Sequence, residues 1–161
     1  MDAIELLKMQ HREVEALFKK IEKAKEEAKQ DLFEQIADAL AVHTAIEEKH
    51  FYPATRSART EELLQEAVEE HLAAKRIIAD LMELSSEEPQ FDAKVKVLKE
   101  QIEHHVEEEE KELFPKVRKM LAKEELEDLA VVMEDMAGDL KASGVPREAV
   151  PAETGEAAPL E

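Results

Sequence analysis

Apolar residues recur at spacings of three and four along most of the chain, and no stretch alternates between apolar and polar residues for any length. Leu7, Val14, Phe18 and Ile21 follow this spacing near the start of the chain. Such spacing places the side chains on one face of an α-helix, whereas a half-buried strand requires alternation. The pattern therefore predicts an all-α protein.

Breaks in the apolar pattern divide the chain into five expected helices, at about 2–29, 31–53, 60–82, 91–121 and 123–141. Pro53 lies near the end of the second and Pro115 interrupts the fourth, because proline removes a backbone donor. Four long helices joined by short loops are typical of an antiparallel up-down-up-down four-helix bundle. The short C-terminal fifth helix has an apolar stripe that either caps the bundle or binds a partner. Residues 1–142 are expected to form one domain, and residues 143–161, which hold few large apolar side chains, a disordered tail.

The net charge of the chain limits the kinds of molecule that it can bind. The formal net charge is −18, so nucleic acid and anionic membranes should repel the chain. Acidic residues also cover solvated helix faces, so charge alone does not identify a cation site. Cysteine is absent, which excludes disulfides and thiolate metal sites. No stretch approaches the roughly 20 apolar residues of a membrane span, and no signal-peptide pattern occurs. We therefore expect a soluble cytoplasmic protein.

Four of the six histidines fall on the expected inward stripes of four different helices: His11, His43, His71 and His105. Two of them are followed four residues later by a glutamate, so that His43 with Glu47 and His105 with Glu109 share a helix face. Burying these groups is costly unless a charge organises them, and a pair of metal cations would do so. Imidazole suits iron, zinc, copper or nickel, and bridging carboxylates suit iron or manganese.

The specificity of this pattern comes from its recurrence. A lone histidine on an apolar stripe is more often an ordinary core residue, and a single His-x-x-x-Glu is weak evidence in a chain with this much glutamate. Here the pair occurs twice, each time before an aromatic-proline step, Phe51-Tyr52-Pro53 and Leu113-Phe114-Pro115. His104 with Glu108 offers an alternative register in the fourth helix. The stripe through Ile102 and Leu113 favours His105 with Glu109.

The segments LLKMQHREVEALF, HTAIEEKHFYP, EEHLAAKRIIADL and HHVEEEEKELFP resemble those of hemerythrin-like (HHE cation-binding) domains. The resemblance covers about residues 1–140 and implies a four-helix bundle with a non-haem di-iron centre. It implies His11, His43, His71 and His105 as terminal ligands, with Glu47 and Glu109 bridging two iron ions. Manganese or zinc would fit similar donors.

Lys75 departs from that resemblance, because the oxygen-carrying hemerythrins have a histidine there. A charged lysine is a poor iron ligand, so one metal should have an open position. Either Glu15 pairs with Lys75 over the site, or both reach solvent at the bundle edge. His50 either contributes to the site, as an extra ligand or by a hydrogen bond to a bridging carboxylate, or is an exposed residue at a helix end. Tyr52 is expected to pack in the core, although its hydroxyl could reach the metals.

Two classes of function follow from such a site. The first is a binding protein for oxygen, nitric oxide or peroxide, as a carrier or sensor, or a protein that handles iron. The alternative is a di-iron enzyme with oxidase or peroxidase-like activity. A structural bundle with zinc or with an empty site is a third hypothesis. The sequence identifies no catalytic residue and no oligomeric state.

Overall fold

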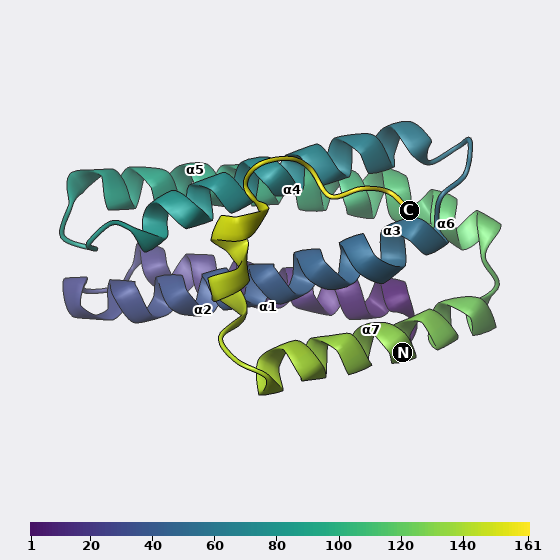
Figure 1. Cartoon of the computed structure of the whole chain (residues 1–161), viewed down its shortest axis with the longest axis horizontal. Helices are drawn as coiled ribbons and strands as arrows, with labels where there is room; N and C mark the ends of the chain where they lie inside the picture. Colours follow the sequence, from purple (N-terminus) through teal and green to yellow (C-terminus); the bar gives the residue numbers. More distant parts are fainter.

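The structure is a computed structural model that describes residues 1–161, and it contains only helices and connections. The helices are α1 (Ala3–Glu22), α2 (Glu26–Ile46), η1 (Glu47–Phe51), α3 (Tyr52–Ala54), α4 (Glu61–Met82), α5 (Pro89–Glu108), η2 (Glu109–Leu113), α6 (Phe114–Met120), α7 (Lys123–Ala142) and η3 (Pro146–Glu153). Helices α1, α2, α4 and α5 run side by side along the long axis of the molecule, and α7 lies alongside α1 and α2 (Figure 1). The predicted all-α class is confirmed. No helix is long and apolar enough to cross a membrane.

The first helix is shorter than its sequence predicts. It ends at Glu22 rather than near Lys29, and α2 begins at Glu26. The connection contains neither glycine nor proline, so its residues give no local stop signal. The break is set by packing instead, because Ile21 and Phe33 must reach the same apolar cluster at this end of the bundle.

Pro115 does not interrupt its helix, whereas the helix that contains Pro53 ends one residue later, at Ala54, as predicted. In both places the helix continues through a π-helical turn, η1 before Pro53 and η2 before Pro115. The backbone N–H of Tyr52 donates to the carbonyl of Glu47, five residues back, and a corresponding bond joins Phe114 to Glu109. In a π turn the backbone N–H bonds to the carbonyl five residues earlier, instead of four. Such a turn changes the hydrogen-bond pattern that a proline ring would disturb in a regular α-helix. Such turns are frequent at functional sites.

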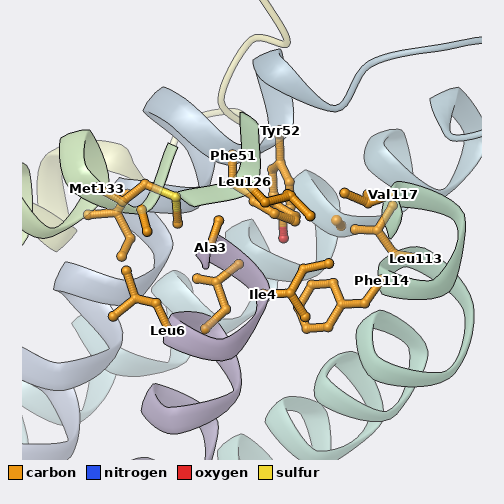
Figure 2. Close-up of a cluster of buried hydrophobic side chains, with 14 of the residues drawn as sticks. Ala3, Ile4, Leu6, Phe51, Tyr52, Leu113, Phe114, Val117, Leu126 and Met133 are labelled. Atoms are coloured by element: carbon orange, nitrogen blue, oxygen red, sulfur yellow. The ribbon is translucent and has the colours of Figure 1, made fainter. Parts of the chain in front are cut away.

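Two apolar clusters fill the interior. One lies near the start of α1, where residues from α1, α3, α6 and α7 meet (Figure 2). It includes Ile4, Phe51, Val117, Leu126 and Met133. The other lies at the opposite end of the bundle. Its largest members are Phe18, Phe33, Ile36, Ile78 and Phe91. Helix α7 contributes its buried face to the first cluster, so the predicted fifth helix packs on the bundle.

The tail expected to be disordered is folded, so that prediction is wrong. The segment η3 crosses α2 and α4, and the chain then continues along α4 toward α3 (Figure 1). Val150 is buried in the second apolar cluster, and Arg147 donates to the carboxylate of Asp38. The guanidinium of Arg76 donates to the backbone carbonyl of Thr154. A few anchors of this kind order a segment whose average composition predicts disorder.

Candidate metal centre

Six side chains meet in the interior between the two apolar clusters. They come from six elements: His11 (α1), His43 (α2), Glu47 (η1), His71 (α4), His105 (α5) and Glu109 (η2). Each is buried, with no more than 4% of its surface exposed. These are the six residues that the sequence proposes as ligands, and helical periodicity brings them together as expected. Their role as ligands stays a prediction.

The six form two overlapping groups of metal-compatible atoms. His11, His43, Glu47 and Glu109 form one group, whose donor atoms lie within 4.8 Å of one another. Glu47, His71 and His105 form the other, at the same limit. Glu47 belongs to both groups. The arrangement can therefore hold metal, with one carboxylate placed between two positions.

Several atoms of the first group lack hydrogen-bond partners. His43 Nε2 lies 3.1 Å from Glu47 Oε1, and His11 Nε2 lies 3.2 Å from Glu109 Oε1. None of these four atoms makes a hydrogen bond of acceptable geometry, and Oε2 of Glu47 also lacks one. Buried polar atoms are nearly always satisfied in native proteins. A bound cation would satisfy all five, so the donor set fits a metal.

Tyr52 supplies the second group with a hydroxyl. Its oxygen lies 2.5 Å from Glu109 Oε2, and 3.2 and 3.4 Å from Nε2 of His71 and His105. Burial and the carboxylates of Glu109 and Glu47 raise the pKa of Tyr52 well above its usual value, so the phenol keeps its proton and donates to Glu109. Figure 2 shows its ring among apolar side chains, with the hydroxyl in red. Tyr52 thus packs in the core and also reaches the site.

The outer nitrogen of each buried histidine has a partner on a neighbouring helix. Nδ1 of His43 lies 2.7 Å from Gln10, and Nδ1 of His71 lies 2.8 Å from Glu48. Likewise, Nδ1 of His105 lies 2.7 Å from Glu70, and Nδ1 of His11 lies 2.6 Å from Glu110. These four partners were not among the residues predicted from the sequence. A signal exists nonetheless, since each partner directly precedes or follows one of the six buried residues.

These outer bonds form a closed ring around the bundle. Helix α1 orients the histidine of α2, and the residue after Glu47 orients that of α4. Helix α4 then orients the histidine of α5, and the residue after Glu109 orients that of α1. Because an oxygen accepts at each Nδ1, that nitrogen carries the proton. In a neutral imidazole Nε2 is then the atom with a free lone pair, and Nε2 is the atom that faces the centre.

Electrostatics couples the carboxylates to the histidines. Burial opposes the ionisation of Glu47, but His43, His105 and His71 outweigh it and hold its pKa well below the ordinary value. Burial likewise opposes the charging of His105, yet Glu109 and Glu47 raise its pKa well above the ordinary value. In the metal-free protein the carboxylates thus favour the ionised form, and the histidines beside them hold extra protons. Metal ions must displace these protons to bind.

Neither of the two alternatives for Glu15 and Lys75 describes both residues. Glu15, with 43% of its side chain exposed, pairs with Arg12 and Lys19 on its own helix and not with Lys75, so that alternative is wrong. Lys75 is buried, and its Nζ lies 2.9 Å from Glu48 and 3.2 Å from Glu153 of η3. The segment taken for a disordered tail therefore supplies the second partner of Lys75.

His50 and His104 stay outside the centre. His50 is half-buried and makes no hydrogen bond with the six buried residues. The side chain of His104 is 66% exposed, so the fourth helix has the register that points His105 and Glu109 inward.

Two cavities adjoin the centre. An enclosed one of about 10 Å³ is lined by Gln10, Val14, Leu40, Thr44, Ile102, Val106 and the four histidines. A larger one of about 280 Å³ lies between α1 and α5, where Arg12, Phe18 and Glu110 line it together with His11. The centre thus has a small, largely apolar space beside its histidines and a route from the surface that reaches His11.

Comparison with known proteins agrees with this geometry. A solved hemerythrin HHE cation binding domain-containing protein from Mycobacterium kansasii is 27% identical, with a TM-score of 0.76, and the match covers 92% of this chain and 99% of that one. A protein of Nostoc sp. named DNA nickase is 31% identical over 131 residues, which is 81% of this chain and 37% of that protein. The chain thus spans about a third of the nickase. The pattern of the Hemerythrin HHE cation binding domain matches residues 2–117. This protein therefore belongs to the hemerythrin HHE cation-binding domain family.

Proposed function

We propose that the centre holds two iron ions. His11 and His43 would bind one, His71 and His105 the other, and Glu47 and Glu109 would bridge them. The observation that carries this proposal is the set of buried, unpartnered nitrogen and oxygen atoms in the first group, which adjoins the second through Glu47. The donors are imidazole and carboxylate without sulfur, a set that suits iron, with manganese and zinc as the closest competitors.

The space beside the histidines limits what the centre could bind. A cavity of about 10 Å³ admits about one water-sized molecule. Val14, Leu40 and Ile102 make much of its wall apolar. Oxygen, nitric oxide and peroxide, with two heavy atoms each, are the ligands closest to this limit, whereas a larger organic substrate far exceeds it. Two irons, when bound, would supply redox chemistry toward such ligands, so we infer that the protein binds or senses one of them or handles iron.

One observation favours an enzyme with oxidase or peroxidase-like activity as the second candidate. Tyr52 keeps a proton on an oxygen that lies within 3.4 Å of both His71 and His105. A positioned phenol of this kind can donate a hydrogen bond or a proton to a small ligand, with solvent as the source of the replacement proton. The cavity between α1 and α5 would give small molecules access from the surface.

Metal analysis and visible spectroscopy test the proposal. Protein loaded anaerobically with Fe²⁺ and then exposed to air should hold two irons per chain and show the visible bands of a ferric di-iron centre. His43→Ala should lower the iron content and abolish these bands. His50→Ala is the matched control, because it removes a nearby histidine that takes no part in the centre. Colourless, fully helical protein without iron would contradict the proposal. Repeated consumption of hydrogen peroxide by the loaded protein, lost in Tyr52→Phe, would favour the enzyme over the sensor.

A further inference from the structure

A second cluster of metal-compatible side chains lies on the surface between α4 and α5. It consists of Glu70, His104 and Glu108, whose donor atoms lie within 4.8 Å of one another. His104 Nε2 is 3.5 Å from Glu70 Oε2 and 3.6 Å from Glu108 Oε2. One imidazole and two carboxylates form a donor set suited to divalent iron, manganese or zinc.

The cluster borders a groove that attracts cations. This groove has a volume of about 770 Å³, and Glu70 and His104 line it together with Glu66, Glu69 and Glu100. Neither lysine nor arginine lines it. A concave surface lined by charges of one sign raises the local concentration of the opposite ion. The groove would therefore concentrate divalent cations beside His104.

A small cavity connects the cluster to the buried centre. It measures about 10 Å³, and its polar lining consists of Glu70, His105, Glu108 and Glu109. Two of these residues belong to the surface cluster and two to the centre. Glu109 Oε1 is fully buried and has no hydrogen-bond partner. That oxygen faces His11 at 3.2 Å, whereas Oε2 of the same carboxylate lies 3.4 Å from His105, so Glu109 reaches from this small cavity to the other half of the centre.

Glu70 contacts both the surface cluster and the buried centre. One of its oxygens lies 2.7 Å from Nδ1 of His105, and the other lies 3.5 Å from His104. A cation held by Glu70 and His104 is therefore separated from His105 by a single carboxylate. Movement inward requires the ion to exchange the carboxylate ligands that line the small cavity and to pass the imidazole of His105, whose Nε2 faces the centre.

We propose that Glu70, His104 and Glu108 form a surface site for a divalent cation, through which metal passes to the buried centre. The surface site is independent of the proposed di-iron function, whereas the passage inward rests on it. The site binds more weakly than the centre because His104 is exposed and water competes for its ligands. Weak binding is what a transfer site requires, since the ion must leave it again.

Equilibrium binding of Mn²⁺ tests the surface site itself. The electron paramagnetic resonance signal of free Mn²⁺ gives the number of ions bound per chain. The double variant His104→Ala/Glu108→Gln should bind one ion fewer than the unaltered protein. Glu107→Gln is the control, because it makes the same change in charge at the next position of α5 and leaves the cluster intact. An unchanged number of bound ions in the double variant would overturn the proposal.

The same titration separates the two proposals. If the centre takes up no metal, the unaltered protein binds Mn²⁺ only at the surface and the double variant binds none. That result supports the surface site and overturns the passage of Mn²⁺ to the centre, whereas loading with Fe²⁺, as described above, tests the di-iron function separately. If the centre is intact and no surface site exists, both proteins bind the same number of ions.

The rate of anaerobic Fe²⁺ uptake tests the passage inward. Samples taken over time, freed of loose metal by gel filtration, give the iron retained in the centre. The double variant should fill the centre about tenfold more slowly, at the lower end of what electrostatic focusing contributes to association rates. Its final iron content should equal that of the unaltered protein. Uptake as fast as that of Glu107→Gln would overturn the passage.

Discussion

The two halves of the centre have the same plan and different surroundings. Each half has two histidines from neighbouring helices, a glutamate on a π turn and an aromatic ring before a proline. Tyr52 precedes Pro53, whereas Phe114 precedes Pro115. Tyr52 gives Glu109, His71 and His105 a hydroxyl partner. Phe114 offers only its ring, which stacks on His11 at 6.0 Å.

The hydrogen-bond partners of the histidine Nδ1 atoms also differ between the two halves. Gln10 accepts from His43 with a neutral amide, whereas Glu70 accepts from His105 with a carboxylate. Glu48 is in turn fixed by buried Lys75. The half with His71 and His105 is thus satisfied largely by protein, whereas His11 and His43 each have a buried nitrogen without a hydrogen-bond partner. The difference shows that a duplicated plan can give two halves with unequal surroundings.

Removing the carboxylate common to both halves should have the largest effect. Glu47 is the one residue in both donor groups, so Glu47→Ala should prevent retention of either ion. His11→Ala removes a donor from one group only and should leave about half of the metal. Metal analysis after dialysis measures both. Equal losses in the two variants would contradict the central role of Glu47.

Breaking an outer bond should have the next largest effect. Glu48→Gln weakens the hold on His71 and leaves the buried ammonium of Lys75 with Glu153 as its only ion-pair partner. Loss of such partners typically lowers metal affinity about 10- to 100-fold. Gln10→Ala removes only a neutral acceptor and should cost less. Competition with a chelator measures the two affinities, and a larger loss for Gln10→Ala would reverse the comparison.

A substitution that makes the two halves of the centre alike should sharpen the comparison between them. Tyr52→Phe gives the second half the aromatic residue of the first and leaves Glu109 Oε2 without its donor. The metal-free protein should lose about 1–3 kcal/mol of unfolding free energy, which is the usual cost of an unsatisfied buried polar group. Urea unfolding with and without metal measures it. The loss should shrink in the loaded protein, because metal satisfies the same oxygen.

The smallest effect concerns pH. Although burial opposes their charging, carboxylates raise the pKa of His11, His71 and His105 in the folded metal-free protein above the unfolded value of 6.5. Their stabilisation is therefore fully present below pH 6.5 and is lost as pH rises through the folded pKa values. Metal-free protein should unfold at a lower urea concentration at pH 8.5 than at pH 6. Metal uptake should show the opposite trend, because binding releases protons.

The sequence predicted the six central residues because helical periodicity alone decides which face of a helix is inward. Among the 40 aspartates and glutamates of the chain, it could not single out Glu48, Glu70 and Glu110. Their importance depends on which helix lies next to which. The end of α1 and the folding of residues 143–161 were predicted wrongly for a related reason. Both depend on packing partners such as Ile21 and Val150, not on local propensity.

The ring of outer bonds alternates between two kinds of step. Gln10 and Glu70 act within a helix pair, from α1 to α2 and from α4 to α5. Glu48 and Glu110 act between the pairs. A two-fold rotation that exchanges the pairs maps each kind of step onto itself. A single helix pair carrying both kinds of partner could therefore close the same ring with a second copy of itself, so a homodimer of half-length chains is a practical design for this centre.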